Sequence, residues 1–460
     1  MEICNWGWEC RRYGYCAERL DFGRLLTAKL NLMLFIIEPM HDSDEFSDIS
    51  IMNFELSNGQ KDILKQIAAA CQSIRDHETE CYLNETINEK IVPTFAPTGM
   101  LGLPISKKYD GKGMDALTYA LALERIGQEG SSLRTFFSCH VSIGQLVLQN
   151  WGNDEQKRKY LPDTTAGKSI MAFALTEPPA GSDPASMTTK FEEKGDHYVL
   201  KGKKHWIGNA TIAHVITTYA KSDDGKVSAF IVQTDSKGFS ANRIQHKMGL
   251  HSLDNGEITF DDCVVPKENL IGLKGRGLSI AYSALMDGRL SVAAGSVGVM
   301  EDCLNEAVKY SKTRVQFGEP LAKKQLIQKH IASIASNIES ARWLVYRACA
   351  AKQKLAEHVE EMKEESNWME NLLTKKNSKY TDLRNEADRL VALAKYHATN
   401  AAFDSANRAV QIMGSAGYSK KSRAARHLLD SRASTILEGA NEVLELKIAQ
   451  SILGREYRAY

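Results

Sequence analysis

The chain has 460 residues, of which 43% are apolar and 25% charged, so it can form two or three domains with a substantial core. Its formal net charge is +1, and its basic runs are short and scattered, which argues against nucleic acid or an acidic membrane surface as the main partner. No apolar run approaches the ~20 residues of a membrane-spanning helix. The nine cysteines have neither zinc-site spacing nor the pattern of a disulfide framework, which predicts a cytoplasmic protein with reduced thiols.

The first part of the chain divides at about Met52. Residues 1–51 are rich in Cys, Trp and Arg without clear periodicity, and we expect an N-terminal extension of unclear structure. Ser57 and Gln60 have the spacing of a capping box, which predicts the start of a helix. Apolar residues then recur at helical spacing, so residues 52–168 are expected to form a helical domain.

Residues 169–275 have the composition of a β-domain. The β-rich runs HVITTYA and VSAFIVQ are joined by KSDDGK, whose Asp-Gly pair is a hairpin signal, and GEITFDDCVV predicts a further strand. Helical spacing returns in residues 276–460, where Val297, Met300 and Leu304 fall on one face. Helices, then strands, then long helices predict an α+β fold.

A charged stretch at about 357–381 lies inside the C-terminal helical part. Leu355, Met362 and Met369 are spaced seven residues apart, but Glu365 interrupts the companion positions of a coiled coil. We interpret this stretch as an insertion that forms a solvent-exposed helical excursion.

Several common functional motifs are missing from the sequence. It has no GxGxxG after a strand, no GxxxxGK[ST] phosphate loop, no HExxH metal site and no GxSxG nucleophile elbow. Five separated segments remain as candidates: MAFALTEPPAGSDPAS (171–186), KKHWIGNA (203–210), RVQFGEP (314–320), QIMGSAGY (411–418) and STILEGANEVLEL (434–446).

In this order and spacing, the five segments resemble those of the acyl-CoA dehydrogenase family. The resemblance runs from about Met52 to the end of the chain, apart from the insertion. It implies an N-terminal helical domain, a middle β-barrel-like domain and a C-terminal four-helix bundle. It also implies FAD bound between the domains and across a subunit interface, in a homotetramer or homodimer.

The first two segments suit a heterocycle or a phosphate. Thr176 and Ser182 offer hydroxyl groups in a loop shaped by glycine and proline, and Trp206 is a flat amphipathic platform. By resemblance, Phe173 to Ser182 line the flavin and the thioester, and Trp206 flanks the ring. Gly208 departs from the family pattern, where Thr or Ser places a hydroxyl near flavin N5. An oxidase, in which oxygen reoxidises the flavin, is therefore an alternative.

A second set of residues suits the ADP half of FAD. Arg314 is a fixed cation for a pyrophosphate, and Phe317 can stack on an adenine. Gln411 places a side-chain amide beside a loop at Gly414 that a ligand can approach closely. The resemblance adds Gln325 and assigns this set to FAD bound mainly by the neighbouring subunit.

Glu438 is the candidate base. Oxidation of a saturated acyl thioester removes a weakly acidic α-proton while a hydride leaves the β-carbon, and a carboxylate in a dry pocket is a competent base. The resemblance gives Glu438 this role, with the hydride passing to flavin N5. Ala440 replaces the usual Thr, so one hydroxyl contact to the cofactor is expected to be missing.

Arg134, in QEGSSLRTFFSCH, is the candidate substrate-binding residue. Its position resembles that of an Arg in glutaryl-CoA dehydrogenases and in dehydrogenases of carrier-protein-bound acyl groups, in routes to hydroxymalonyl, methoxymalonyl or aminomalonyl units. The glutaryl branch has an acid seven residues earlier, where this chain has Gly127, which favours the carrier-protein branch. A buried structural ion pair of Arg134 is the alternative.

The sequence therefore predicts FAD-dependent oxidation of an acyl thioester, with a small polar acyl group on an acyl carrier protein as the leading substrate. The alternatives are an acyl-CoA dehydrogenase or oxidase of fatty or amino acid catabolism, and a catalytically silent scaffold of the same fold. CoA and carrier protein present the same arm, so the sequence does not separate them, and it does not identify the electron acceptor. We expect no metal, no nucleic acid and no membrane insertion.

Overall fold

A computed structural model describes residues 55–364, 367–374 and 377–457 of the chain. The chain divides into two units, Met1–Glu55 and Leu56–Tyr460, and the described helices and strands belong to the second. The predicted N-terminal extension, residues 1–51, lies outside the described residues. Within the described part, no helix combines the length and the apolar character needed to cross a membrane.

Helices form the first part of the second unit. They are α2 (Asn58–Asn84), α3 (Ile91–Phe95), α4 (Ala116–Gly127), α5 (Ser131–Phe137), α6 (Leu146–Trp151) and α7 (Asp154–Thr165). The predicted capping box is confirmed, because Ser57 Oγ accepts a hydrogen bond from Gln60 N at 3.3 Å and Gln60 Oε1 accepts one from Ser57 N at 2.8 Å. A π-helical segment, Ser138–Gln145, joins α5 to α6. Such segments occur frequently at functional sites.

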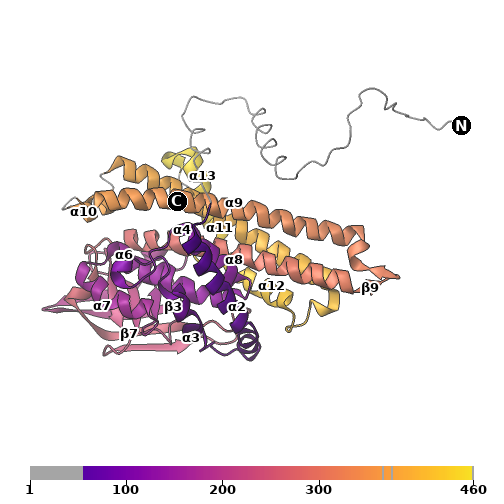
Figure 1. Ribbon diagram of the computed structural model, residues 1–460. Helices are drawn as coiled ribbons and strands as arrows, with labels where there is room; N and C mark the ends of the chain where they lie inside the picture. Colours follow the sequence, from indigo (N-terminus) through magenta and orange to yellow (C-terminus); the bar gives the residue numbers. More distant parts are fainter. Residues whose placement is uncertain (1–54, 365–366, 375–376, 458–460) are drawn as a thin grey trace, which may run out of the picture. The chain divides into compact units, whose positions relative to one another are not determined.

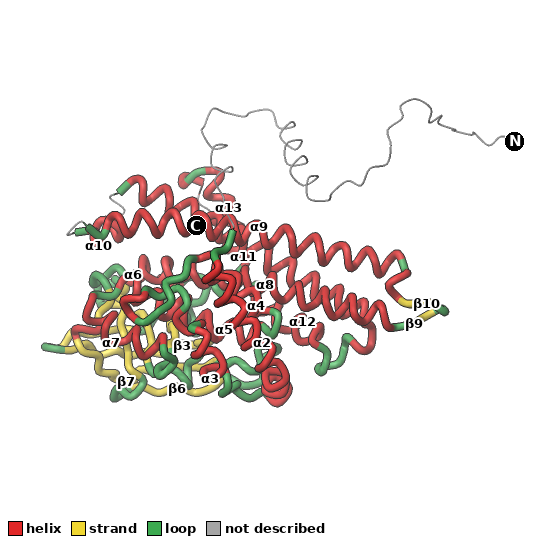
Figure 2. The backbone as a smooth tube through the Cα atoms, viewed as in Figure 1, coloured by secondary structure: helices red, strands yellow, loops and turns green. Residues whose placement is uncertain are grey.

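The middle part is an eight-stranded sheet. Its strands are β1 (Met171–Ala174), β2 (Lys190–Lys194), β3 (His197–Gly208), β4 (Val215–Lys221), β5 (Val227–Gln233), β6 (Phe239–Arg243), β7 (Asn255–Pro266) and β8 (Leu270–Ile271). The order is β6-β7-β3-β2-β4-β5-β8, with β1 parallel to β4, so the path is open rather than a closed barrel. The predicted hairpin is confirmed by antiparallel β4 and β5, and the further strand by β7. Figure 2 shows the strands of this sheet gathered together in one part of the unit.

Long helices form the C-terminal part. They are α8 (Gly277–Thr313), α9 (Gln325–Met362), α10 (Trp368–Thr374), α11 (Ser378–Met413), α12 (Arg423–Ser434) and α13 (Asn441–Leu453), with a short hairpin of β9 (Val315–Gln316) and β10 (Glu319–Pro320) after α8. Helices α8, α9 and α11 run side by side (Figure 1). The 37 residues of α8 extend over about 55 Å. The observed order of helices, sheet and helices confirms the α+β fold.

Glycines allow α4 and α8 to cross with their backbones in contact. A Cβ on Gly127 would lie 2.3 Å from the carbonyl oxygen of Gly295, and a Cβ on Gly298 would lie 1.8 Å from that of Glu124. A side chain at either position would push the helices apart, so this crossing depends on glycine. Helix α5 follows α4 after three residues and is thereby held against α8.

The charged insertion is helical, as predicted. The interpretation that it is exposed to solvent is wrong for the side that faces the protein core. It extends α9, turns through α10 and returns in α11. Met362, Leu372, Leu373 and Tyr380 are each at most 4% exposed and belong to one core cluster with Trp151. The many charged residues of this stretch obscured an amphipathic pattern whose apolar side is buried.

Candidate active site

Glu438 lies in a tight turn between α12 and α13. Its φ is 57° and that of Gly439 is 99°, so two successive residues are left-handed. This conformation costs a non-glycine residue roughly 1–2 kcal/mol and is typical of functional sites. Two cations hold the turn: Arg289 Nε donates to the Glu438 carbonyl oxygen at 2.9 Å, and Lys395 Nζ donates to that of Gly439 at 2.9 Å.

The Glu438 carboxylate is shielded from water on the side of α8. Although the residue as a whole is half-buried, its Oε2 is buried without a hydrogen-bond partner. A Cβ on Gly288 would lie 2.4 Å from Oε2, so the carboxylate rests directly on the α8 backbone. Burial raises the pKa of Glu438 to about 7, against the opposing charges of Arg289, Arg134 and Lys395. A carboxyl group with a pKa near 7 is well suited to act as a base.

Arg134 on α5 lies against the same face of α8. Its side chain is among the largest fully buried ones, and Nη1 is buried without a hydrogen-bond partner. A Cβ on Gly295 would lie 2.7 Å from Arg134 Cγ, two helical turns beyond Gly288. Burial lowers the pKa of Arg134, while Cys139 and Glu438 oppose that shift. Among the described residues, Arg134 has no ion-pair partner, which argues against the alternative of a structural ion pair. An unpaired buried cation indicates a functional role.

Cys139, which the sequence analysis did not single out, explains the unusual glycine at position 208. A Cβ on Gly208 would lie 2.4 Å from Cys139 Sγ, so the thiol occupies the space that a side chain at position 208 requires. Burial raises the pKa of Cys139 to about 12, and the charge of Glu438 adds to this effect. The thiol is therefore protonated at neutral pH, and Ser or Thr cannot replace Gly208 without moving it.

Gly208→Ala is expected to destabilise the protein, because the added methyl group collides with the Cys139 thiol. In the double variant with Cys139→Ala the collision is relieved, since the two Cβ atoms are then about 3.5 Å apart. We expect a coupling free energy of roughly 0.5–3 kcal/mol between the two positions. Urea unfolding of the wild type, both single variants and the double variant measures it, and additive effects would show that the residues do not compete for this space.

Thr176 and Trp206, two of the predicted flavin-ring residues, lie near each other where β1 and β3 are close. Thr176, just after β1, accepts a hydrogen bond at its carbonyl oxygen from His205 N at 2.9 Å, next to Trp206. Trp206 has a φ of 62° and is 55% exposed, so its indole presents a face to a flat partner. Phe173 is buried in β1, and Ser182 is exposed in the loop beyond Thr176.

A buried ion pair fixes the loop that carries Thr176 and Ser182. Lys204 Nζ donates to Glu177 Oε1 at 2.8 Å, and both side chains are fully buried. Burial alone would raise the pKa of Glu177, but Lys204 and hydrogen bonds from Thr189 and Thr188 lower it to about 2. Glu177 is thus an ionised anchor that joins the loop to β3, not a second base.

The predicted ADP-binding residues lie at the other end of the helical bundle. Arg314 follows α8 and is about 39 Å along that helix from Gly288. Phe317 is 95% exposed in the β9–β10 hairpin, which Figure 1 shows remote from the sheet. The same end of the bundle holds Gln325, Gln411 and Gly414. Within one chain, the predicted ADP-binding residues therefore lie far along α8 from the Glu438 turn.

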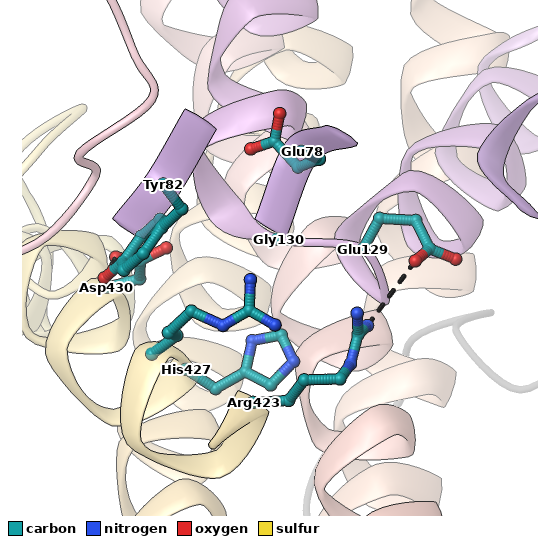
Figure 3. Close-up of a pocket in the computed structure, with 8 residues that line it drawn as sticks. Glu78, Tyr82, Glu129, Gly130, Arg423, His427 and Asp430 are labelled. Carbon is teal, nitrogen blue, oxygen red and sulfur yellow. Dashed lines mark hydrogen bonds and ion pairs between the residues drawn. The ribbon is translucent and has the colours of Figure 1, made fainter. Parts of the chain in front are cut away.

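A buried polar cluster fastens α12, the helix before the Glu438 turn. Tyr82 Oη donates to Asp430 Oδ1 at 2.9 Å, which links α2 to α12. Arg423 Nε donates to Asp302 Oδ2 at 2.7 Å, and the same guanidinium is 3.5 Å from Glu129. Figure 3 shows Arg423 directed toward Glu129, close to the start of α5. These pairs hold α5, which carries Arg134, and the turn that carries Glu438 in position relative to each other.

Comparison with known proteins adds independent evidence. Three family profiles match in chain order: the N-terminal domain of acyl-CoA dehydrogenases over residues 57–168, the middle domain over 172–263 and the C-terminal domain over 275–453. The chain belongs to the acyl-CoA dehydrogenase family. Its recognition from the five sequence segments is confirmed, and membership makes the protein an oxidoreductase.

Curated relatives in this family act on different acyl groups. The chain is 34% identical over 406 residues to the short-chain specific acyl-CoA dehydrogenase of Clostridium acetobutylicum, covering 87% of this chain and 100% of the relative. It is also 34% identical to the glutaryl-CoA dehydrogenase of Desulfococcus multivorans, covering 80% of this chain and 88% of the relative.

Solved structures of three kinds resemble this fold. Butyryl-CoA dehydrogenase from Megasphaera elsdenii has a TM-score of 0.79 at 32% identity, covering 88% of this chain and 100% of its own. An acyl-CoA dehydrogenase complexed with FAD from Bacillus anthracis has a TM-score of 0.77 at 30% identity, and the match covers 87% of this chain and 67% of the other. The prolyl acyl carrier protein oxidase AnaB has a TM-score of 0.77 at 27% identity, and the match covers 87% of this chain and 100% of AnaB.

Proposed function

We propose that this acyl-CoA dehydrogenase family member oxidises a short acyl group with an anionic or polar end, held as a thioester on an acyl carrier protein. Its general activity is the FAD-dependent oxidation of acyl thioesters. The observation that carries the finer proposal is Arg134, a buried cation with an unpartnered Nη1 that senses the charge of Glu438. An anionic group on the substrate would satisfy both its charge and its hydrogen-bonding capacity.

Glu438 is the base in this proposal. Its carboxylate takes the proton from the α-carbon, or from an O–H group if the substrate is an aldehyde hydrate. Arg289 and Lys395 bind the backbone of the turn, which keeps the carboxylate in place during proton transfer. Bound FAD supplies the acceptor for the hydride.

The chain's own residues fit FAD. The exposed indole of Trp206 offers a face on which a flat ring can stack, while the Cys139 thiol fills the space beside Gly208. Arg314 and Phe317, both exposed, suit a pyrophosphate and an adenine. Because these two sets lie at opposite ends of α8, we propose a homo-oligomer in which one subunit provides the ring site and a second provides the ADP site.

Two features favour a carrier protein over CoA. The acid expected seven residues before Arg134 in the glutaryl branch is replaced by Gly127, and a side chain there would collide with Gly295 on α8. In addition, AnaB, a structural relative, acts on an acyl carrier protein. A CoA thioester is the second candidate, since the curated relatives at 34% identity are acyl-CoA enzymes.

The proposal is tested by anaerobic loss of the flavin's visible absorbance. Butyryl, glutaryl, glyceryl and seryl groups should each be offered on CoA and on acyl carrier protein. We expect rapid reduction only by the polar groups on the carrier protein. Rapid reduction by simple acyl-CoAs would instead assign the enzyme to fatty or amino acid catabolism, and peroxide formation in air would identify an oxidase.

The reaction is expected to require the ionised form of Glu438. Since burial raises the pKa of this carboxyl to about 7, it is protonated and inactive as a base at lower pH. We therefore expect kcat/KM to fall about tenfold per pH unit below pH ~7 and to level off above it. Stopped-flow flavin reduction across this range measures the profile, and a plateau that extends down to pH ~5 would assign the base to another group.

A further inference from the structure

The end of α2 carries donor atoms that the proposed reaction does not use. His77 Nε2 lies 3.1 Å from Glu89 Oε1 and 3.5 Å from Cys81 Sγ. One donor atom from each of the three residues lies within 4.8 Å of the others, and among the described residues only this His/Cys/Asp/Glu group does so.

The local fold brings these residues together. His77 and Cys81 are four residues apart on α2 and therefore lie on the same face of the helix. The helix ends at Glu85, whose φ is 55°, and Thr86 N donates to the Cys81 carbonyl oxygen at 2.9 Å. This left-handed cap reverses the chain and returns Glu89 to the face that carries His77.

Two of the three distances between donor atoms are close to those of a tetrahedral zinc site. Zinc binds thiolate at about 2.3 Å and nitrogen or oxygen at about 2.0–2.2 Å, which places neighbouring ligand atoms roughly 3.3–3.6 Å apart. The His77–Cys81 and His77–Glu89 pairs are close to this spacing. The Glu89 side chain is 69% exposed, so a small movement of its carboxylate can close the remaining gap to Cys81.

The surroundings of His77 complete the arrangement. Metal-binding histidines usually donate their second ring N–H to a carboxylate, and the exposed Glu80 carboxylate, with Oε2 3.7 Å from His77 Nδ1, needs only a small movement to accept that hydrogen bond. A thiolate from Cys81 and the carboxylate of Glu89 together neutralise a divalent cation.

We propose that His77, Cys81 and Glu89 bind one Zn²⁺ ion that links the end of α2 to the loop after it, with water as the fourth ligand. The cysteine spacing did not indicate this site, because the site uses a single cysteine. It does not depend on the proposed reaction, since none of its residues belongs to the candidate active site.

Titration of the full FAD-loaded chain with Co²⁺ tests the site. We expect a thiolate-to-cobalt charge-transfer band in the difference spectrum, saturating at about one equivalent and abolished by added Zn²⁺. Cys81→Ser should remove the band, and His77→Ala and Glu89→Gln should weaken Co²⁺ binding at least tenfold. Cys71→Ser is the matched control, because Cys71 is another buried cysteine on α2 outside the group.

A second readout does not depend on the spectrum. Zn²⁺ should raise the unfolding temperature of the wild type but not that of His77→Ala, since a ligand that binds only the folded state stabilises it. An unchanged Co²⁺ band in both Cys81→Ser and His77→Ala would overturn the site, as would its complete absence from the wild type. Flavin reduction should be unaffected by His77→Ala, which separates this inference from the proposed function.

Discussion

Replacing Glu438 with glutamine is expected to lower the rate of substrate-dependent flavin reduction by about 10²–10⁴-fold, the usual contribution of a general base. Glutamine has nearly the same size and cannot accept the proton. The backbone contacts from Arg289 and Lys395 do not involve the side chain, so the turn should keep its shape. Stopped-flow reduction under anaerobic conditions measures the loss.

Two controls separate loss of the base from loss of the site. Glu442→Gln removes an exposed carboxylate from the first turn of α13 and should leave the rate unchanged. The FAD content of Glu438→Gln should equal that of the wild type. A variant that retains FAD and reduces it at the wild-type rate would mean that Glu438 is not the base.

Replacing Arg134 with methionine is expected to change substrate selection. For acyl groups with a terminal carboxylate, kcat/KM should fall roughly 10–150-fold, because one charge-assisted hydrogen bond contributes about 1.5–3 kcal/mol. Loss of the Arg134 charge also raises the pKa of Glu438, so the comparison is made at a pH where Glu438 is ionised in both proteins; there, kcat/KM for an uncharged butyryl group should not fall. Steady-state kinetics with the two substrates on the same carrier measures the difference.

Stability provides the decisive control for Arg134. A buried cation with an unpartnered Nη1 destabilises the folded protein, so methionine should keep or raise the free energy of unfolding. Arg158→Met, which removes an exposed arginine on α7, should leave substrate selection unchanged. Equal losses for both substrates together with a lower unfolding free energy would show that Arg134 is structural.

Local signals in the sequence were sufficient for much of the fold. Ser57 and Gln60 form their capping box within four residues, and the Asp-Gly pair before β5 turns the chain within six, so neither depends on distant contacts. The insertion was interpreted wrongly because its exposed charges outnumber its buried residues. Its apolar side became evident only where Leu372 and Leu373 meet the core.

The residues of the candidate site also form two groups: those with a local signal in the sequence and those without one. Glu438 and Arg134 could be identified because their neighbours in sequence form recognisable segments. Arg289 could not, since it is 149 residues from the carbonyl oxygen that it binds, and no local pattern records such a contact. Gly288 gave no signal either, because a helical glycine without its tertiary contact is only a weak helix former.

Helix α8 supports both candidate residues, Glu438 and Arg134, at a fixed spacing. The base rests on Gly288 and the stem of Arg134 on Gly295, so seven residues of helix, about 10 Å, fix the spacing between the two supports. Moving either glycine to the next turn of α8 would change this spacing by about 5.4 Å. Under the roles proposed for Glu438 and Arg134, we expect the length of the accepted acyl group to change in steps of a helical turn rather than gradually.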